Sequence, residues 1–354
     1  MTTVRPIRQT LLSIAAFMSL SAASPSPIIQ SYDDYQSWLV ACDNTLTCVA
    51  RGFDDSNPGA EIEIGRAAGP SGAITASISA LQRFTLADIR VDGTPANLRG
   101  PKWQVIATDD QTSATTNDLA TVRALVQQLR NASAVTLGGG DAQVPLAGFA
   151  AAMLRLDDRQ GRSGGVTAVL KPGTLPASRV PAPPPLPKIP HHPISARLAP
   201  GEEGRLIAAV RASQKALLAK EECGETPEQP EAHALDGRQA LVLLPCVMGA
   251  YQGSSLAFIA SRTNNRAQRL VAPTPYLGQD PDRSRADFFT NAGFDADTGT
   301  LSMGAKGRGL ADCGFSADWI WDGTSFRLSE MTLQRSCGGL EPGDWPVLYR
   351  SMRQ

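Results

Sequence analysis

The chain has 354 residues, a formal net charge of −1 at pH 7 and a hydrophobic fraction of 42%. This near-neutral balance, without a long run of Lys and Arg, gives no electrostatic footprint for nucleic acid or anionic lipid. The hydrophobic fraction is sufficient for ordinary cores, which excludes a wholly disordered chain.

The first residues predict export. Arg5 and Arg8 precede an apolar run over 11–20, and Ser21-Ala22-Ala23 follows it. This order of basic, apolar and small residues is typical of a cleavable secretory signal peptide over 1–23, and the run is too short to span a bilayer. We expect no further transmembrane segment and, because no Cys follows the cleavage site, no lipid anchor. A retained amphipathic N-terminal helix is the alternative.

Proline marks the expected domain boundary. Residues 172–200 contain ten prolines. Proline lacks the amide donor and fixes its own φ, so the segment favours extended polyproline II and a semi-rigid spacer. We therefore expect an N-terminal domain over 24–171, a Pro-rich linker over 172–200 and a C-terminal domain over 201–354. A proline-rich ligand for a partner's aromatic groove is the other interpretation.

Six cysteines remain after signal cleavage, and an even number in an oxidising compartment favours disulfides. The economical pairing within each domain is Cys42–Cys48, Cys223–Cys246 and Cys313–Cys337, although the four C-terminal partners could be exchanged. The 42–48 pair would close a tight hairpin, with Asp43 and Asn44 supplying turn chemistry. The spacing is not that of a Cys-x-x-Cys redox motif or a zinc knuckle, so those are the minor alternatives.

Apolar periodicity predicts an α+β N-terminal domain. Strands are expected over 32–42, 48–52, 60–64, 73–78, 88–91 and 103–107. One helix should begin after an Asn117 cap and continue to about Leu129. A second helix should run from about Leu146 to Arg159, with Pro145 at its start and Gly161 beyond its end.

The C-terminal domain should open with one helix over 202–222, which has acidic residues first and basic residues later, as the helix dipole favours. Apolar runs separated by turn formers then predict strands, with a turn at 295–300. The clearest hairpin has Trp319–Trp321, a turn at 322–325 and a return from Phe326. We expect an antiparallel meander with the helix packed on it. The predicted fold class is thus α+β: two domains, each mainly antiparallel β-sheet with one or two packed helices.

No motif assembles a catalytic set, a metal site or a cofactor site. His191 and His192 lie in the linker, His233 lies in a polar loop, and there is no Gly-x-Ser-x-Gly elbow. Adjacent carboxylates at 109–110, 157–158 and 221–222 usually point apart. The glycine-rich stretches at 138–140 and 304–309 lack Walker spacing and read as hairpin turns.

One aromatic cluster is the candidate ligand site. Four aromatic residues lie within 27 residues, close in sequence to Cys313 and Cys337: Trp319, Trp321, Phe326 and Trp345. Strand alternation puts Trp319 and Trp321 on one face. They form either a core beside the disulfide or a platform for a glycan, a peptide or a partner chain.

Four stretches resemble a bacterial envelope family known as domain of unknown function 1176: WLVACDNTLTCVARGF, LAGFAAAMLRLDDRQGR, LPCVMGAYQGSS and CGFSADWIWDGTSFRL with the following CGG and W. The resemblance implies an exported protein of Gram-negative bacteria without assigned activity. The family pattern would have Asn after GAY, where this chain has Gln252. The first domain alone is also similar to invasion-associated locus B proteins, through its W-x-V-x-C and L-x-G-F-x-x-A patterns.

These observations favour a periplasmic, non-enzymatic binding or accessory factor of the cell envelope, with an unknown envelope ligand or protein partner. An envelope hydrolase that uses two carboxylates is the alternative, and facing acidic groups in a concave pocket would indicate it. A protein–protein scaffold is the third hypothesis, and an exposed apolar patch around Trp319 and Trp321 would be its sign.

Overall fold

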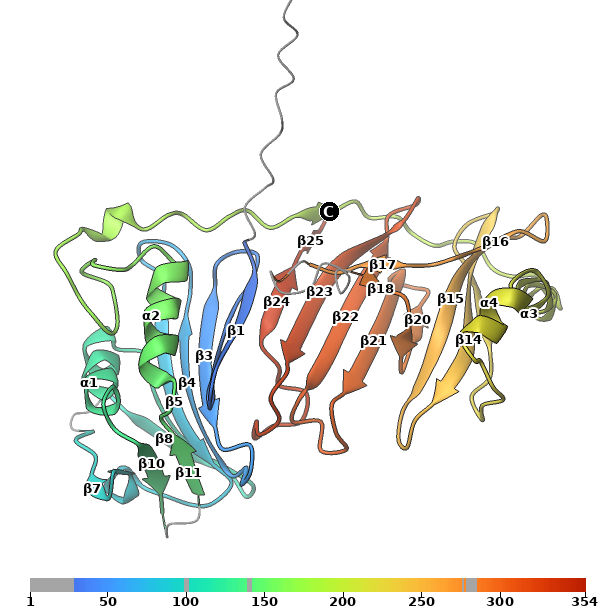
Figure 1. Cartoon of the computed structure of the whole chain (residues 1–354). Helices are drawn as coiled ribbons and strands as arrows, with labels where there is room; N and C mark the ends of the chain where they lie inside the picture. The colour runs from blue at the N-terminus through green and yellow to red at the C-terminus, as the bar shows by residue number, and fades with distance from the viewer. Residues whose placement is uncertain (1–28, 99–101, 139–141, 276, 278–284) are drawn as a thin grey trace, which may run out of the picture.

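Antiparallel β-sheets dominate the computed structural model, which describes residues 29–98, 102–138, 142–275, 277 and 285–354 (Figure 1). Four α-helices accompany the sheets in this part of the chain. The predicted α+β class is therefore confirmed, whereas the predicted signal peptide lies outside the described residues.

The N-terminal half is built on a seven-stranded sheet in the order β1-β2-β3-β4-β5-β9-β8. Its strands are β1 (Ser31–Tyr35), β2 (Trp38–Cys42), β3 (Cys48–Phe53), β4 (Ala60–Arg66), β5 (Ile74–Ala80), β8 (Gln104–Ala107) and β9 (Thr112–Thr116). A smaller sheet contains β6 (Arg90–Val91), β7 (Thr94–Pro95), β10 (Ala134–Leu137) and β11 (Ala142–Pro145). Helices α1 (Leu119–Leu129) and α2 (Phe149–Arg159) complete this half.

Both N-terminal helices begin one to three residues later than their sequence predicts. Asp118, not Asn117, caps α1 and accepts a hydrogen bond from the Thr121 amide at 2.9 Å. Helix α2 cannot start at Leu146 because Pro145 still belongs to β11. Gly148 turns the chain into α2 with a φ of +93°, and a Cβ there would lie 1.8 Å from the Tyr35 carbonyl oxygen. Only glycine fits this close approach.

The motif residues of the first half meet in its core. Trp38 donates from Nε1 to the Pro145 carbonyl oxygen at 2.9 Å, and its ring contacts Phe149 edge-on at 4.8 Å between centroids. The two stretches that begin at Trp38 and Leu146 are thus packing partners, which gives them a structural role.

The C-terminal half contains two five-stranded sheets. The first has β13 (Glu231–Ala234), β14 (Gln239–Met248), β15 (Gly253–Ser261), β16 (Ala267–Arg269) and β19 (Phe289–Thr290), which pairs with β15. The second is the predicted meander: β20 (Gly293–Asp295), β21 (Thr300–Lys306), β22 (Gly314–Trp321), β23 (Phe326–Gln334) and β24 (Val347–Arg350). The expected single helix is divided at Gln214 into α3 (Glu202–Ser213) and α4 (Lys215–Lys220).

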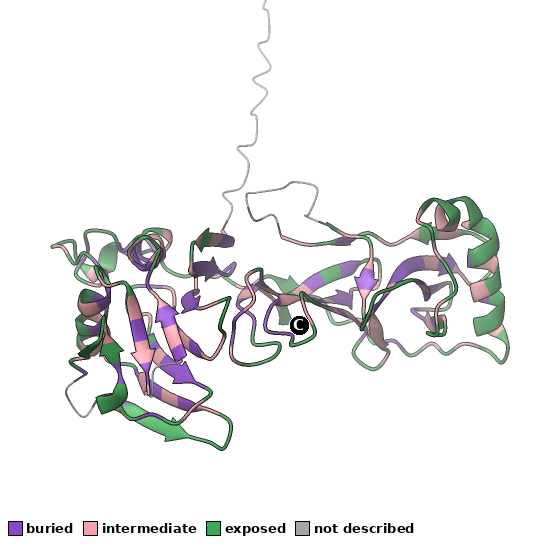
Figure 2. Cartoon of the chain, turned by 60° about the horizontal axis from the view of Figure 1, so that its bottom comes forward, coloured by how far each residue is buried: buried purple, intermediate pink, exposed green. Residues whose placement is uncertain are grey.

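Burial follows this layering. Leu206 and Val210 of α3 pack on one face of the β14–β15 sheet with Val242 and Phe258. The opposite face of that sheet shares a core with β21–β23. In Figure 2 the outer sides of the helices and the loop tips are exposed, whereas the buried residues concentrate on the strands.

A short two-stranded strap crosses the apolar face of the second sheet. It comprises residues 270–275 with β17 (Ala272–Pro273) and residues 285–288 with β18 (Arg285–Ala286). Trp319 of β22 donates from Nε1 to the Pro273 carbonyl oxygen at 2.6 Å, which fixes the strap to the sheet beneath it.

The proline-rich segment lies along both halves (Figure 1). It contains a 3₁₀ turn (Ala177–Arg179) and β12 (Lys188–Ile189), which pairs in parallel with β25 (Met352–Arg353) near the C-terminus. Val180, Ile189 and Ile194 are buried. The segment is therefore packed against the protein, and the proposed domain division at 172–200 stays a prediction.

The three predicted disulfides are confirmed: Cys42–Cys48, Cys223–Cys246 and Cys313–Cys337. Cys42 and Cys48 lie directly opposite each other in the β2–β3 hairpin. Asp43 organises its turn, because Oδ1 accepts from the amides of Thr45 at 2.8 Å and Thr47 at 2.9 Å.

The same hairpin joins the two halves. Asn44 donates from Nδ2 to the Arg350 carbonyl oxygen and accepts from the Arg350 amide through Oδ1, both at 2.9 Å. Asp43 forms an ion pair with the Arg350 guanidinium at 2.6 Å. Behind the turn, Tyr32 and Leu39 share a hydrophobic core with residues of the meander. Strands β1 to β3 are therefore covered on both faces.

A buried charged cluster strengthens this junction. Arg51 of β3 is 4% exposed and contacts Glu63 at 2.6 Å and Asp344 at 3.0 Å through Nη2. Its Nε lies 3.4 Å from Glu61, and its Nη1 donates to Gln334 at 3.1 Å. The Arg51 guanidinium thus links Glu61 and Glu63 of the N-terminal half to Gln334 at the end of β23 and to Asp344 in the loop that follows.

This cluster predicts a pH-dependent stability. Burial raises the pKa of Glu61 from 4.5 to about 7, with Glu63 and Asp344 adding to the rise and Arg51 opposing it. Between these values the folded protein holds a proton that the unfolded chain has released, so stability falls as pH rises through this window. Glu61→Gln should remove this slope and gain up to about 3 kcal/mol relative to wild type between pH 5 and pH 8.

Urea unfolding at four pH values tests this, with the exposed Glu330→Gln as the matched control. Parallel pH profiles for wild type and Glu61→Gln would show that Glu61 titrates alike in the folded and unfolded states.

Candidate functional site

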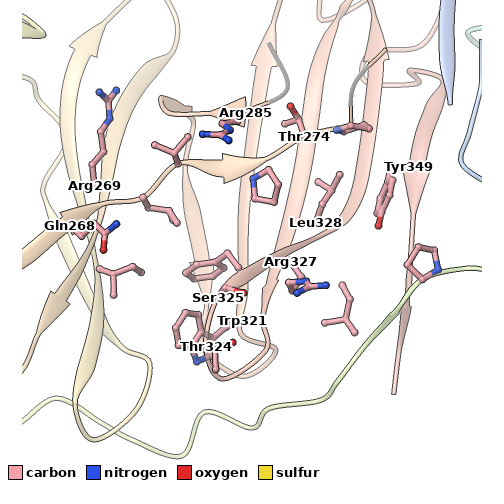
Figure 3. Close-up of a pocket in the computed structure, with 18 of the residues that line it drawn as sticks. Gln268, Arg269, Thr274, Arg285, Trp321, Thr324, Ser325, Arg327, Leu328 and Tyr349 are labelled. Carbon is pink, nitrogen blue, oxygen red and sulfur yellow. The ribbon is translucent and has the colours of Figure 1, made fainter. Parts of the chain in front are cut away.

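A groove of about 840 Å³ opens on the apolar face of the meander (Figure 3). Its walls come from segments far apart in sequence: Pro187–Ile189 of the proline-rich segment, β15 and β16, the strap, and the β22–β23 hairpin. The volume lies in the range of small-molecule sites, which is roughly 300–1,000 Å³.

The groove floor is aromatic and aliphatic. Trp321, Phe326 and Leu328 lie on one face of the sheet, because strand side chains alternate and Trp321 pairs with Phe326 in the hairpin register. The two rings are 5.3 Å apart between centroids. All three side chains are buried, so only a small part of their apolar area faces the groove.

The groove rim is cationic. Lys188, Arg269, Arg285 and Arg327 line it, and no carboxylate is among its described lining residues. Arg269 is partly neutralised by Glu221 at 2.9 Å and Asp287 at 3.4 Å, and Arg327 lies 3.8 Å from Asp322. Within the described part of the chain, Lys188 and Arg285 make no ion pair. The groove therefore has an excess of positive charge.

Neutral hydroxyl groups complete the groove. Thr324 and Ser325 of the hairpin turn and Tyr349 of β24 reach it, as Figure 3 shows. The Thr324 and Ser325 hydroxyls donate to Asp322, at 2.8 and 3.5 Å. Burial raises the pKa of Tyr349, so its hydroxyl stays protonated in the physiological range. Guanidinium groups, hydroxyls and an apolar floor together suit an anionic group attached to an apolar body.

One donor at the floor lacks an acceptor. Trp38, Trp319 and Trp345 donate from Nε1 to carbonyl oxygens at 2.9, 2.6 and 3.1 Å. The buried Nε1 of Trp321, by contrast, has no hydrogen-bond partner in the described structure. An unsatisfied buried N–H costs about 1–3 kcal/mol. A ligand oxygen that reached this atom would relieve that cost.

The structure places the four predicted aromatic residues in different surroundings, and all four are buried. Trp321 and Phe326 line the groove, whereas Trp319 lies beneath the strap and Trp345 packs against Gly314. The exposed apolar patch that would indicate a scaffold is therefore not formed by Trp319 and Trp321. The ligand-binding role of the cluster stays a prediction.

Sequence reasoning missed the cationic rim. Its members come from four segments and follow no common spacing. The only signal was the local density of arginine around 262–269 and 283–285, which surface exposure alone would also explain.

Acidic groups gather elsewhere. A hollow of about 240 Å³ is lined by Glu228 and Glu231, both exposed, and Glu231 contacts His233 at 3.0 Å.

The other acidic candidates have structural surroundings. Asp157, of the adjacent carboxylates at 157–158, accepts hydrogen bonds from the Val169 and Leu170 amides and so has a structural role. Among the described residues, only Asp312, Cys313 and Cys337 place potential metal-binding atoms close together. The two cysteine sulfurs form a disulfide with each other.

The glycine-rich stretches and Gln252 serve the β-sheets. Residues 304–306 still belong to β21, and only 307–309 lie in the predicted β21–β22 connection, whereas 139 and 140 lie outside the described residues. Gln252, at the β14–β15 turn, donates to the Lys306 carbonyl oxygen at 3.1 Å and accepts from the Lys306 amide at 3.0 Å. Gln252, which stands where the family pattern has Asn, thus joins the two sheets through a side chain that is one methylene longer than that of Asn.

Comparisons with known proteins agree with the resemblance of the four sequence stretches, and they do not show the one to invasion-associated locus B proteins. No helix among the described residues is long and apolar enough to cross a membrane. The uncharacterized protein YpfG of Escherichia coli (strain K12) is 31% identical over 354 residues, which covers 96% of this chain and 97% of the relative. No solved structure matches the chain. The family model described as protein of unknown function (DUF1176) matches residues 32–352, and the chain therefore belongs to this family.

Proposed function

We propose that the protein is a non-enzymatic binding factor of the bacterial periplasm that holds an anionic ligand with an apolar part in the groove. The observation behind this proposal is the lining itself: four cations and no carboxylate among the described lining residues, above the floor formed by Trp321 and Phe326. Opposite charge favours an anion, and the apolar floor adds affinity for the body that bears it.

Export is supported by the cysteines and by the first residues. The chain pairs all six of its cysteines, which is typical of an oxidising compartment and rare in the cytosol. Arg5, Arg8 and the apolar run that follows predict the cleavable signal. The partial likeness of the first half to invasion-associated locus B proteins stays a prediction that rests on sequence patterns alone.

The hydrolase alternative has one location in its favour. Glu228 and Glu231 line the same small hollow, as a two-carboxylate mechanism requires. Both side chains are exposed, however, whereas the acid of such a pair is normally kept protonated by burial. The groove is the better supported site because it combines volume, charge and an apolar floor.

Binding of phenyl phosphate tests the proposal, with uncharged phenol as the matched probe. Wild-type protein should bind phenyl phosphate, and Arg285→Gln with Arg327→Gln should weaken binding by at least about tenfold, since one charge-assisted hydrogen bond contributes roughly 1.5–3 kcal/mol. Arg211→Gln, on the exposed side of α3, is the control. Isothermal titration calorimetry gives the affinities.

Two results would contradict the proposal. One is equal affinity for phenyl phosphate and phenol, because it would remove the role of charge. The other is equal weakening by Arg211→Gln and by the groove double variant, because it would place the anion elsewhere.

A further inference from the structure

A second hollow, of about 580 Å³, lies on the other side of the strap. Its walls are mainly apolar: Phe288 of the strap, Leu277, and Met303, Phe315, Met331 and Leu333 of the meander. Methionine is unbranched and adapts to irregular shapes, so such walls suit a flexible aliphatic chain.

The second hollow and the groove occupy one continuous sheet face. In β22, Phe315, Ala317, Trp319 and Trp321 alternate with the outward residues and so point to the same side. Phe315 lines the second hollow, Trp321 lines the groove, and Trp319 lies between them under the strap. The strap is therefore the partition, and Thr274, Pro275 and Arg285 line both hollows.

The charged residues that line the second hollow are balanced, with Asp34 and Asp287 against Arg285 and Arg335. Asp34 lies 3.6 Å from Arg335, and Asp287 lies 3.4 Å from Arg269. Arg285 makes no ion pair with a described residue and is exposed. Because it lines both hollows, an anionic group bound to Arg285 can be attached to a chain that lies in the apolar hollow.

We propose that the ligand is an anionic amphiphile, with a phosphate-type head at Arg285 and an alkyl chain over Met303, Phe315, Met331 and Leu333. This inference rests on the proposed function and names its ligand class. The anionic head would bind the cations of the groove rim, and the alkyl chain would pack against the apolar walls of the second hollow.

A series of alkyl phosphates from butyl to decyl, each below its micelle concentration, tests the inference by calorimetry on the mature chain. Affinity should rise by up to about fourfold per methylene, which corresponds to about 0.8 kcal/mol, until the hollow is filled. Arg285→Gln should weaken all members by a similar factor. Met331→Gln should reduce the dependence on chain length while leaving butyl phosphate unaffected.

Methyl NMR of the five methionines in residues 24–354 keeps the test valid if Met331→Gln fails to fold. Decyl phosphate should shift the Met303 and Met331 signals, and inorganic phosphate should not. Binding of butyl phosphate without any dependence on chain length would overturn the inference and leave the proposed function standing. Absence of binding by every member would overturn both.

Discussion

Replacement of Arg51 by Met is expected to lower the free energy of unfolding by about 3–5 kcal/mol. The guanidinium is buried at the junction of the two halves, where it contacts Glu61, Glu63 and Asp344. Met retains the apolar stem but leaves the carboxylates without a cation. A buried charge that loses its partner costs far more than a solvated one.

Urea unfolding at pH 8 measures this effect, because Glu61 is mainly ionised there. The combination of Arg51→Met with Glu61→Gln and Glu63→Gln should recover most of the loss, since the charges to be compensated are gone. An Arg51→Met variant as stable as wild type would show that the Arg51 ion pairs add nothing to the junction, which would then rest on the contacts of Asp43 and Asn44 with Arg350 and on the apolar core.

Trp319→Ala, made in the wild-type protein, is expected to lower the free energy of unfolding by about 3–5 kcal/mol, as large-to-small core substitutions do. The side chain is fully buried at the centre of the meander and packs edge-on against Phe289, at 5.6 Å between centroids. Its removal opens a cavity beneath the strap and deletes the hydrogen bond to Pro273. The wall shared by the groove and the second hollow would then lose its anchor.

Trp319→Phe helps to separate the two contributions, because it keeps a six-membered aromatic ring in the core and removes the pyrrole ring with its N–H donor. It should cost about 1–2 kcal/mol, near the value of one hydrogen bond whose buried acceptor is left unpaired. Thermal unfolding and proteolysis of the strap give the two readouts. Equal losses in the Ala and Phe variants would mean that the hydrogen bond, not packing, dominates at this position.

Local features were predictable from sequence where one stretch contains the whole signal. The hairpin at Trp319–Phe326 formed as expected, because two alternating apolar runs flank a turn whose Asp322 accepts amide hydrogen bonds from Thr324 and Ser325. The disulfides are those of the most economical pairing within each half, although the sequence left open an exchange among the four C-terminal cysteines. Helix starts were less accurate, because Asp118 competes with Asn117 for the cap and β11 retains Pro145.

Features built from distant segments were not predictable. Asp43 and Asn44 read correctly as turn residues, yet nothing nearby in sequence indicates their partner, Arg350, some 306 positions away. Ile189 is buried within a segment whose composition favours a solvated spacer. The groove belongs to the same class, because Lys188, Arg285 and Arg327 meet only through the strand order.

The indole N–H region of a ¹H–¹⁵N NMR spectrum tests the central claim, that the groove over Trp321 binds the anion. On titration with phenyl phosphate, the Trp321 signal, assigned from Trp321→Phe, should shift most and saturate with the calorimetric affinity. The signals of Trp38, Trp319 and Trp345, which already have acceptors, should move little. A Trp321 signal that stays in place while phenyl phosphate binds would contradict the account.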